Sequence, residues 1–414
     1  MLPTAWHPDG EALVPASAQD PLSTRIFGGI PGEDARVRAL GAGKQQRYAH
    51  WRSADLPSPD RIQPACPHYW SCGGCPWMHL NATAAATAKV GALRAALVKE
   101  GLDLPIEALR EADREGYRHL LKLQVGHDGS LGAYGRHSHT VQEIPHCKVL
   151  APALRPLLRL PEAPVSMRVM VARLSSTNGK VMLTVVSRER TKDVQQYASL
   201  LQEDSVVFHQ NQKDGDGLFD YSRPFVPLRG DPWIEEQVGR AKIRVGPGEF
   251  YQTYPAMARR LWEELPLPQG KLVDLYCGVG AVSLALWGRS REKLEIFGVE
   301  EGEAAVRRAT QNAQLNGVEA SFVAQKMAEA TVPATYAESM VVVNPPRKGL
   351  EVGVVQKLIH LRPQPLVYIS CNPAALARDL RLLLAGGMKL RSLRPYDMFP
   401  QTPHLETVAV LEQA

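Results

Sequence analysis

The chain has 414 residues, of which 44% are hydrophobic and 22% charged, and its formal net charge is +5. This is the composition of a globular protein with two or three domains. No apolar run approaches the ~20 residues of a membrane span, and the first residues resemble no signal peptide. We therefore expect a cytoplasmic monomer without a membrane partner. The mild basic excess is compatible with a polyanionic partner but does not demand one.

Short apolar stretches broken by Gly and Pro occupy residues 20–55, a pattern typical of a small antiparallel β-barrel. Basic side chains alternate there with aromatic rings, which offers phosphate neutralisation together with flat stacking surfaces. These residues are Lys44, Arg47, Tyr48, Trp51, Arg52 and, just beyond, Arg61. Taken alone, the pattern favours an ordinary solvated sheet surface. The proline-rich stretch 55–65 predicts a linker.

Three cysteines follow this linker with the spacing C-x5-C-x2-C, and a fourth lies far downstream in IPHCKVL. They are Cys66, Cys72, Cys75 and Cys147. Four thiolates can close a zinc site or ligate a [4Fe–4S] cluster, whereas disulfides are improbable in a cytosolic chain. Zinc sites usually consist of two close pairs, so the three-plus-one arrangement favours iron–sulfur over zinc, with free thiols as a third alternative.

The alanine-rich segment 82–101 predicts a helix that ends near Gly101. Strand-like pieces interrupted by Gly turns fill residues 105–240 and predict hairpins in a mixed α+β central domain. From residue 241 onward apolar strands alternate with helical segments, which indicates a doubly wound, Rossmann-like α/β domain.

The sequence DLYCGVGAVSLAL at 274–286 is typical of a strand, a Gly-rich turn and a helix, which is how α/β sheets build a nucleotide-type cofactor site. Gly278 and Gly280 let the chain turn sharply beside a ligand. Ser283 stands where a dinucleotide fingerprint has its third glycine, which argues against NAD. Glu300 follows the next strand and can accept hydrogen bonds from ribose hydroxyls, and the adjacent Glu301 is an alternative.

Cys371 comes directly after the apolar run 366–369, where a buried strand would end. Glu406 closes the segment DMFPQTPHLE, in which two prolines fix the local backbone. A thiol nucleophile and a separate carboxylate base are the minimum needed to add to a double bond and later remove a proton. Cys277 is the competing thiol, although its place in the Gly-rich loop favours buried packing. His404 is the second candidate base.

Together the segments NPPRKGL, YISCNP, DMFPQTPHLE and DLYCGVG resemble the RNA uracil-C5 methyltransferase family, over nearly the whole chain. The resemblance implies that S-adenosylmethionine methylates carbon 5 of a uridine. Cys371 would add to carbon 6 as the nucleophile, and Glu406 would remove the proton from carbon 5. The resemblance also implies that the four clustered cysteines hold a [4Fe–4S] cluster, with a structural or RNA-shaping role.

Further roles are implied position by position. Gln252 matches a glutamine that contacts the cofactor, Tyr276 an aromatic at the pocket wall, and Asn344 a contact to methionine or uracil. Ala281 and Lys326 depart from the family pattern in the cofactor loop and at the adenine contact. Arg347 and Lys348 are expected to bind RNA phosphate or to hold the catalytic loop.

The resemblance also implies the domain organisation and the target. Residues 1–63 would form a TRAM-like, OB-like RNA-binding barrel, 64–80 and 105–240 the iron–sulfur domain, and 81–104 with 241–414 the catalytic domain. A cluster motif behind a TRAM-like domain favours 23S rRNA, with the T-loop of tRNA as the alternative. The target base must leave its stack to reach a buried thiol. A different kind of function, a non-catalytic RNA-binding or assembly protein, is a further alternative. Such a protein would not require the Cys371–Glu406 pair. An iron–sulfur electron-transfer protein would leave Cys371 unexplained.

Overall fold

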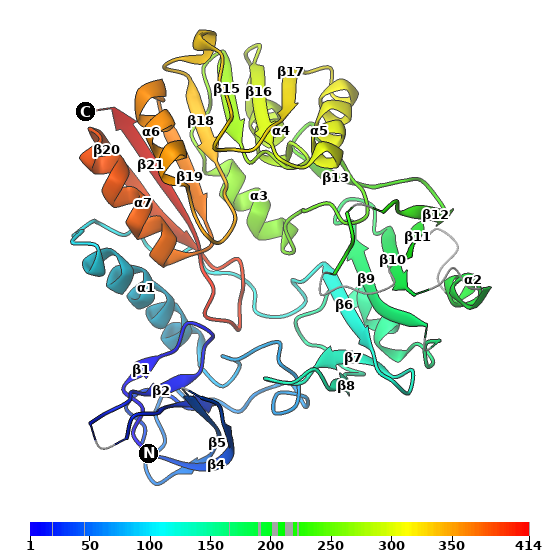
Figure 1. Ribbon diagram of the computed structural model, residues 1–414, viewed down its shortest axis with the longest axis vertical. Coiled ribbons are helices and arrows are strands. Elements are labelled where there is room, and N and C mark those ends of the chain that lie inside the picture. Colours follow the sequence, from blue (N-terminus) through cyan, green and yellow to red (C-terminus); the bar gives the residue numbers. More distant parts are fainter. Residues whose placement is uncertain are drawn as a thin grey trace.

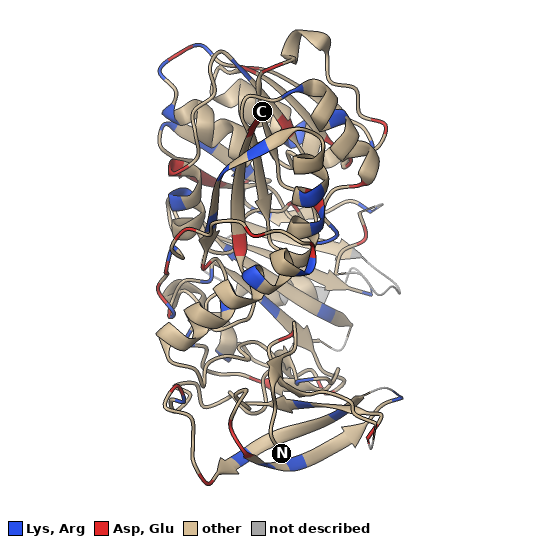
Figure 2. Cartoon of the chain, turned by 90° about the vertical axis from the view of Figure 1, so that its left-hand side faces the viewer, with Lys and Arg blue, Asp and Glu red and all other residues tan. Residues whose placement is uncertain are grey.

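The computed structural model describes the whole chain except residues 19, 45, 165, 189–191, 201–205, 212–217, 222 and 414. Its three larger sheets are separate in space, with the N-terminal sheet at one end of the long axis and the C-terminal sheet at the other (Figure 1). Basic and acidic positions are interspersed over the side of the chain that Figure 2 shows.

The N-terminal sheet has the strand order β1-β2-β3-β5-β4. Its strands are β1 (Ala5–Trp6), β2 (Ala12–Val14), β3 (Ser23–Phe27), β4 (Ala35–Ala42) and β5 (Gln46–Ala54). The expectation of purely antiparallel pairing was wrong, because β3 and β5 pair in parallel. The reason is that β4 lies outside β5 and pairs antiparallel with it, so the chain returns into the gap beside β3 in the original direction.

The central sheet has seven strands in the order β12-β11-β10-β9-β6-β7-β8. They are β6 (Leu120–Val125), β7 (Leu131–Tyr134), β8 (Val141–Glu143), β9 (Met167–Leu174), β10 (Val181–Ser187), β11 (Val206–Asn211) and β12 (Val226–Arg229). The two predicted hairpins are present as the antiparallel pairs β6–β7 and β9–β10. The 3-10 helix η1 (Pro152–Arg159) packs on β9, and α2 (Lys192–Ser199) precedes β11.

The C-terminal sheet has the order β17-β16-β15-β18-β19-β21-β20, and β21 alone runs antiparallel to the other strands. They are β15 (Lys271–Leu275), β16 (Glu295–Glu300), β17 (Glu319–Ala324), β18 (Met340–Val343), β19 (Leu366–Ser370), β20 (Met388–Tyr396) and β21 (Glu406–Gln413). The strand order reverses between β15 and β18, the place where open α/β sheets bind ligands. The doubly wound arrangement predicted from residue 241 onward is therefore present.

Helices cover both faces of the C-terminal sheet (Figure 1). They are α3 (Pro255–Glu263), α4 (Ala281–Arg289), α5 (Glu303–Leu315), α6 (Val352–Leu361) and α7 (Pro373–Ala385), with the 3-10 turn η2 (Ala334–Tyr336) beside β15. The hairpin of β13 (Ile234–Val238) and β14 (Ala241–Val245) packs against α4 and α5.

The helix predicted for 82–101 is α1 (Ala82–Lys99), which is N-capped by the side chain of Asn81. Its buried Leu93 and Leu97 belong to the same hydrophobic core as Leu376 and Leu380 of α7. The helix thus packs on α7 of the C-terminal α/β domain although it precedes the central sheet in the sequence, as Figure 1 shows.

Candidate active site

The Gly-rich turn after β15 has the backbone expected of a ligand-binding loop. Tyr276, Gly278 and Gly280 all have positive φ, and Gly280 caps the N-terminus of α4. A Cβ atom at Gly278 would meet nothing within 4 Å, so the space in front of this turn is open. The Gly278 N–H donates to Glu300 Oε2 at 3.1 Å, and Glu300 Oε1 accepts from the Gly302 N–H at 3.0 Å. This geometry places the Glu300 carboxylate directly beside the turn.

Asp274, on β15 just before the turn, lies beside this loop and was not predicted from the sequence as a candidate site residue. It is 1% exposed, and neither carboxylate oxygen has a hydrogen bond of ordinary geometry among the described residues. Burial raises the pKa of Asp274 to about 7, an effect that the nearby Ser283 only partly opposes. The signal available in the sequence was an acid at the end of an apolar strand, immediately before a Gly-rich turn.

Cys371 and Glu406 lie next to each other across two neighbouring strands. The antiparallel register of β19 and β21 pairs Ser370 with Thr407, and the next residue along each strand is Cys371 and Glu406. Glu406 is 3% exposed, and burial raises its pKa to about 8. Burial and the nearby Glu406 carboxylate raise the pKa of Cys371, whereas Arg347 lowers it.

Arg347 reaches Cys371 from the loop that follows β18. Asn372 ties this loop to the end of β19, since its side chain donates to the Arg347 carbonyl at 2.8 Å and also caps α7 by accepting from the Ala374 N–H. The buried Asp379 of α7 accepts from the Leu350 N–H at 2.8 Å. The loop that carries this cation is therefore fixed against the end of β19 and against α7.

Side chains and backbone groups from α1, from the loop before β6 and from the segment after Cys75 hold the segment that leads into Glu406. Lys89 of α1 is 1% exposed and bonds both the Asp397 carboxylate and the Phe399 carbonyl. The Tyr117 hydroxyl donates to the Pro400 carbonyl at 2.8 Å. Arg114 donates to Gln401 Oε1 at 2.7 Å, and Gln401 in turn accepts through its carbonyl from the Trp77 N–H at 3.0 Å. These contacts fix the start of β21, and none of them was predicted from the sequence.

The remaining predicted residues divide between this edge and its surroundings. Asn344 follows β18, and its N–H donates to the Leu275 carbonyl at 3.4 Å, so it lies at the edge beside the Gly-rich turn. Gln252 is half-buried in the segment before α3, and among the described residues no side-chain hydrogen bond joins it to the edge. Lys326 is exposed just after β17, and Ala281 is the first residue of α4.

Cys277, the competing thiol, and His404, the competing base, have different surroundings from Cys371 and Glu406. Cys277 is 6% exposed, its sulfur packs against Gly298, and burial raises its pKa well above the ordinary range. His404 lies near Phe399, with ring centroids 6.1 Å apart, and burial followed by the charge of Arg347 lowers its pKa. Of the two thiols, Cys371 is the one beside a carboxylate and a cation.

Comparison with known proteins decides the family. Residues 257–414 match the family model described as tRNA (uracil-5-)-methyltransferase. A Streptomyces avermitilis protein named "uncharacterized RNA methyltransferase" is 31% identical over 93% of this chain and 92% of its own length. A protein of the same description from Thermosynechococcus vestitus is 31% identical over 92% of this chain and 91% of its own. The chain belongs to the RNA uracil-C5 methyltransferase family.

The fold of this methyltransferase is similar to a solved one. The structure of Pyrococcus abyssi tRNA (uracil-54, C5)-methyltransferase in complex with S-adenosyl-L-homocysteine matches with a TM-score of 0.79 at 24% identity. The match covers 99% of this chain and 98% of the other. In the part of the methyltransferase that the structure describes, no helix is both long and apolar enough to cross a membrane.

The four clustered cysteines of the methyltransferase line one cavity of about 300 Å³. Burial raises the pKa of the Cys75 thiol to about 12, and the nearby Cys147 and Cys72 raise it further. Among the described residues, however, no three of these sulfurs lie within 4.8 Å of one another. Four thiolates on one zinc ion would have sulfurs only ~3.8 Å apart.

Proposed function

We propose that this methyltransferase transfers a methyl group from S-adenosylmethionine to carbon 5 of a specific uridine in RNA, with Cys371 as nucleophile and Glu406 as proton acceptor. The observation that carries the proposal is the pairing of Cys371 with Glu406 at the edge that also holds the Gly-rich turn. A thiol beside a buried carboxylate is the set of groups that addition and later proton removal require.

The residues at this edge fit the cofactor. The open space in front of Gly278 leaves room for a ligand close to the backbone, and the Glu300 carboxylate is placed to accept from ribose hydroxyls. Tyr276 and Asn344 follow β15 and β18 and are proposed as contacts, together with Gly280, and Gln252 is proposed to approach from the segment before α3. When bound, S-adenosylmethionine supplies an electrophilic methyl group.

The chain's own groups account for the remaining steps. The Cys371 sulfur adds to carbon 6 of uracil, and the electron pair of the broken double bond makes carbon 5 nucleophilic toward the methyl group. The Glu406 carboxylate then removes the proton from carbon 5, and the thiolate leaves as the double bond forms again. A pKa of about 8 makes ionised Glu406 a stronger base than an exposed glutamate, and close enough to neutrality to be partly ionised.

We propose 23S rRNA as the substrate and the T-loop uridine of tRNA as the alternative. The four-cysteine motif behind an N-terminal sheet supports the ribosomal target. The alternative is supported by the likeness in fold to a protein that acts on uracil-54 of tRNA. In either RNA the target base must be unstacked to reach a thiol as buried as Cys371.

We assign residues 1–63 to a TRAM-like RNA-binding unit, 64–80 with 105–240 to an iron–sulfur unit, and 81–104 with 241–414 to the catalytic unit. The packing of α1 on α7 supports the split assignment of the catalytic unit. The hairpin of β13 and β14 crosses the last boundary, and its packing on α4 and α5 favours a boundary before β13.

We further propose that Cys66, Cys72, Cys75 and Cys147 hold a [4Fe–4S] cluster. Their common cavity supports one shared inorganic core, and their three-plus-one spacing in the sequence favours a cubane cluster over zinc. Methyl transfer to uracil needs no electron, so the cluster is assigned a structural role.

The test is to incubate the wild-type protein and Cys371→Ala with radiolabelled S-adenosylmethionine and with undermodified 23S rRNA or tRNA in separate reactions. We expect label in 23S rRNA with wild type only. Label in tRNA alone would support the proposed chemistry but would identify tRNA, not 23S rRNA, as the substrate. Equal labelling by Cys371→Ala would contradict the proposed nucleophile.

A further inference from the structure

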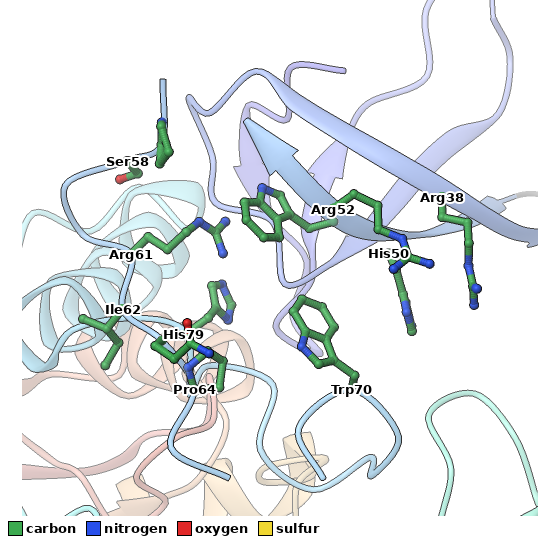
Figure 3. Close-up of a pocket in the computed structure, with 12 residues that line it drawn as sticks. Arg38, His50, Arg52, Ser58, Arg61, Ile62, Pro64, Trp70 and His79 are labelled. Carbon is green, nitrogen blue, oxygen red and sulfur yellow. The ribbon is translucent and has the colours of Figure 1, made fainter. Parts of the chain in front are cut away.

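A second cavity lies far from the active-site edge, where the N-terminal sheet meets the linker and the cysteine loop. Its volume is about 700 Å³. Its lining comes from β4 and β5, from the linker at 57–64, and from Trp70, which stands between Cys66 and Cys72. Figure 3 shows Arg38, His50 and Arg52 together on one side, Arg61 and Ile62 on the other, and Trp70 between the two groups. Nothing in the proposed chemistry uses this cavity.

Two indole rings of the cavity wall have the same orientation. The rings of Trp51 and Trp70 are inclined by only 7°, with centroids 6.5 Å apart. Trp70 is 42% exposed, and the edge contacts of its ring with Phe27 and Tyr69 hold it in place. Gly28 also matters, because a Cβ atom there would lie 2.9 Å from the Trp70 ring. The exposed ring is therefore positioned by its neighbours and presents a flat apolar surface.

The cations of the cavity fall into two kinds. Arg61 stacks on the Trp51 ring at 3.9 Å and is ion-paired with the buried Glu33, so its charge is neutralised and its position fixed. Arg38 and Arg52 are exposed, and neither has an ion pair among the described residues. None of the described residues lining the cavity is acidic. The cavity therefore carries two available positive charges beside parallel aromatic rings.

The neighbouring imidazole adds no third charge. His50 lies directly across from Arg38 in the β4–β5 register. Burial lowers the pKa of His50, and the nearby arginines, Arg136, Arg38 and Arg52, lower it further. A neutral ring between two guanidinium groups can accept or donate a hydrogen bond without repelling either of them.

Available cations beside flat rings, with no acid among them, are the features by which proteins hold unpaired nucleic acid. Bases of any identity can stack on the indole faces, and phosphates can pair with the guanidinium groups. An acidic peptide would use the arginines but would leave the aromatic surface without a partner. The chemistry therefore favours single-stranded RNA over a protein ligand.

We propose that this cavity binds an unpaired segment of the RNA substrate, with bases stacked on Trp51 and Trp70 and phosphates at Arg38 and Arg52. The proposal rests on the proposed function, because it takes the ligand to be that substrate. It gives the cysteine loop a second task, since the loop that carries Cys66 and Cys72 also positions Trp70. The substrate would then be gripped at two places, at the active-site edge and at this cavity.

The test measures binding of a fluorescently labelled, unstructured RNA oligonucleotide to the full-length chain by anisotropy. Trp70→Ala is expected to weaken binding about tenfold, and Trp70→Phe to restore most of it, because the loss is that of one stacking surface. Arg52→Ala is expected to weaken binding and to reduce the slope of log affinity against log salt by about 1. Arg391→Ala, an exposed arginine of β20 paired with Glu412, is the matched control.

Affinity for the oligonucleotide that is unchanged in both Trp70→Ala and Arg52→Ala would overturn the proposal. An acidic peptide that binds with the same dependence on Trp70 would overturn the assignment to RNA. Methyl-transfer kinetics separate this proposal from the proposed function. Trp70→Ala should raise KM for RNA with kcat unchanged. If the chain shows no methyl transfer but its binding of RNA still depends on Trp70, the binding site proposed here would stand and the proposed reaction would be wrong.

Discussion

Cys371, directly after β19, lies beside the buried Glu406 of the adjacent antiparallel strand β21. Ser370 pairs with Thr407, and Cys371 follows Ser370 whereas Glu406 precedes Thr407. The two groups affect each other, because the charge of Glu406 adds to burial in raising the pKa of Cys371. Protonation of Glu406 removes this negative charge, so the thiolate of Cys371 is more stable when Glu406 is protonated. Arg347 acts in the same direction and lowers the pKa of Cys371.

The rate of methyl transfer should rise with pH, because the thiolate of Cys371 is the reactive form and its pKa is raised. Replacing Arg347 with alanine removes a group that lowers this pKa, so the ascending limb of the pH–rate profile should move to higher pH. Single-turnover rates across the pH range measure the limb. Lys348→Ala is the control, since Lys348 is paired with Glu351 and should alter RNA affinity without moving the limb. A limb at the same pH in Arg347→Ala would contradict this assignment.

The stability of the fold should depend on pH through Glu406. Its pKa in the folded chain, about 8, lies above the usual ~4.3. The stability that this group contributes is therefore present in full at low pH and is lost as the pH rises through 8. Glu406→Gln stays neutral, so it should gain stability relative to wild type between pH 5 and 8.5, by at most about 4 kcal/mol. Urea unfolding at the two pH values measures the gain.

The control for this comparison is Glu412→Gln, on the same strand but exposed and paired with Arg391. Its free energy of unfolding should differ from that of wild type by an amount that changes little with pH. A free-energy difference for Glu406→Gln that is the same at both pH values would show that folding does not raise the pKa of Glu406 in this range.

The contact of Lys89 with Asp397 should matter for both stability and catalysis. Lys89→Met leaves the Asp397 carboxylate partly buried without its cation, which should cost about 3 kcal/mol of unfolding free energy. It should also lower kcat, because the segment that begins at Asp397 sets the start of β21. Lys99→Met, at the exposed end of the same helix, is the matched control. Wild-type kcat in folded Lys89→Met would show that this contact does not position Glu406.

The proposed cluster predicts that loss of Cys72 removes iron and sulfide from the protein without abolishing methyl transfer outright. Protein purified without oxygen should contain about four iron and four sulfide per chain, and Cys72→Ser should lose most of both. Cys277→Ser, in the buried loop behind Gly278, should retain them. Zinc in place of iron and sulfide would refute the cluster assignment. RNA affinity should fall in Cys72→Ser, because the same loop carries Trp70.

Local patterns predicted the features whose cause is local. Glycines at positive φ, the Asn81-capped helix α1 and a cysteine at the end of β19 all have short-range signals in the sequence. Contacts between distant segments could not be predicted in this way. Lys89 and Asp397 are 308 residues apart, and no pattern around either residue identifies the other as its partner.

The same limit applies to the N-terminal sheet and to its cations. Of the basic residues singled out in the sequence, Arg47 is paired with Asp20 and Arg61 with Glu33, so neither charge is available. Arg38 was overlooked, although it lies across from His50 in the cavity wall. The parallel pairing of β3 with β5 brings the acidic partners close to these arginines and so decides which charges are neutralised. The alternation of apolar residues in the sequence does not reveal this pairing.

The most direct test of the account uses Glu406→Gln with RNA and radiolabelled S-adenosylmethionine. If Cys371 attacks carbon 6 and Glu406 removes the proton from carbon 5, this variant should methylate the base but fail to release it. A labelled protein–RNA adduct should then survive a denaturing gel, and it should be absent from the double variant Cys371→Ala/Glu406→Gln. Release of methylated RNA by Glu406→Gln at the wild-type rate, or the same adduct in the double variant, would contradict the mechanism.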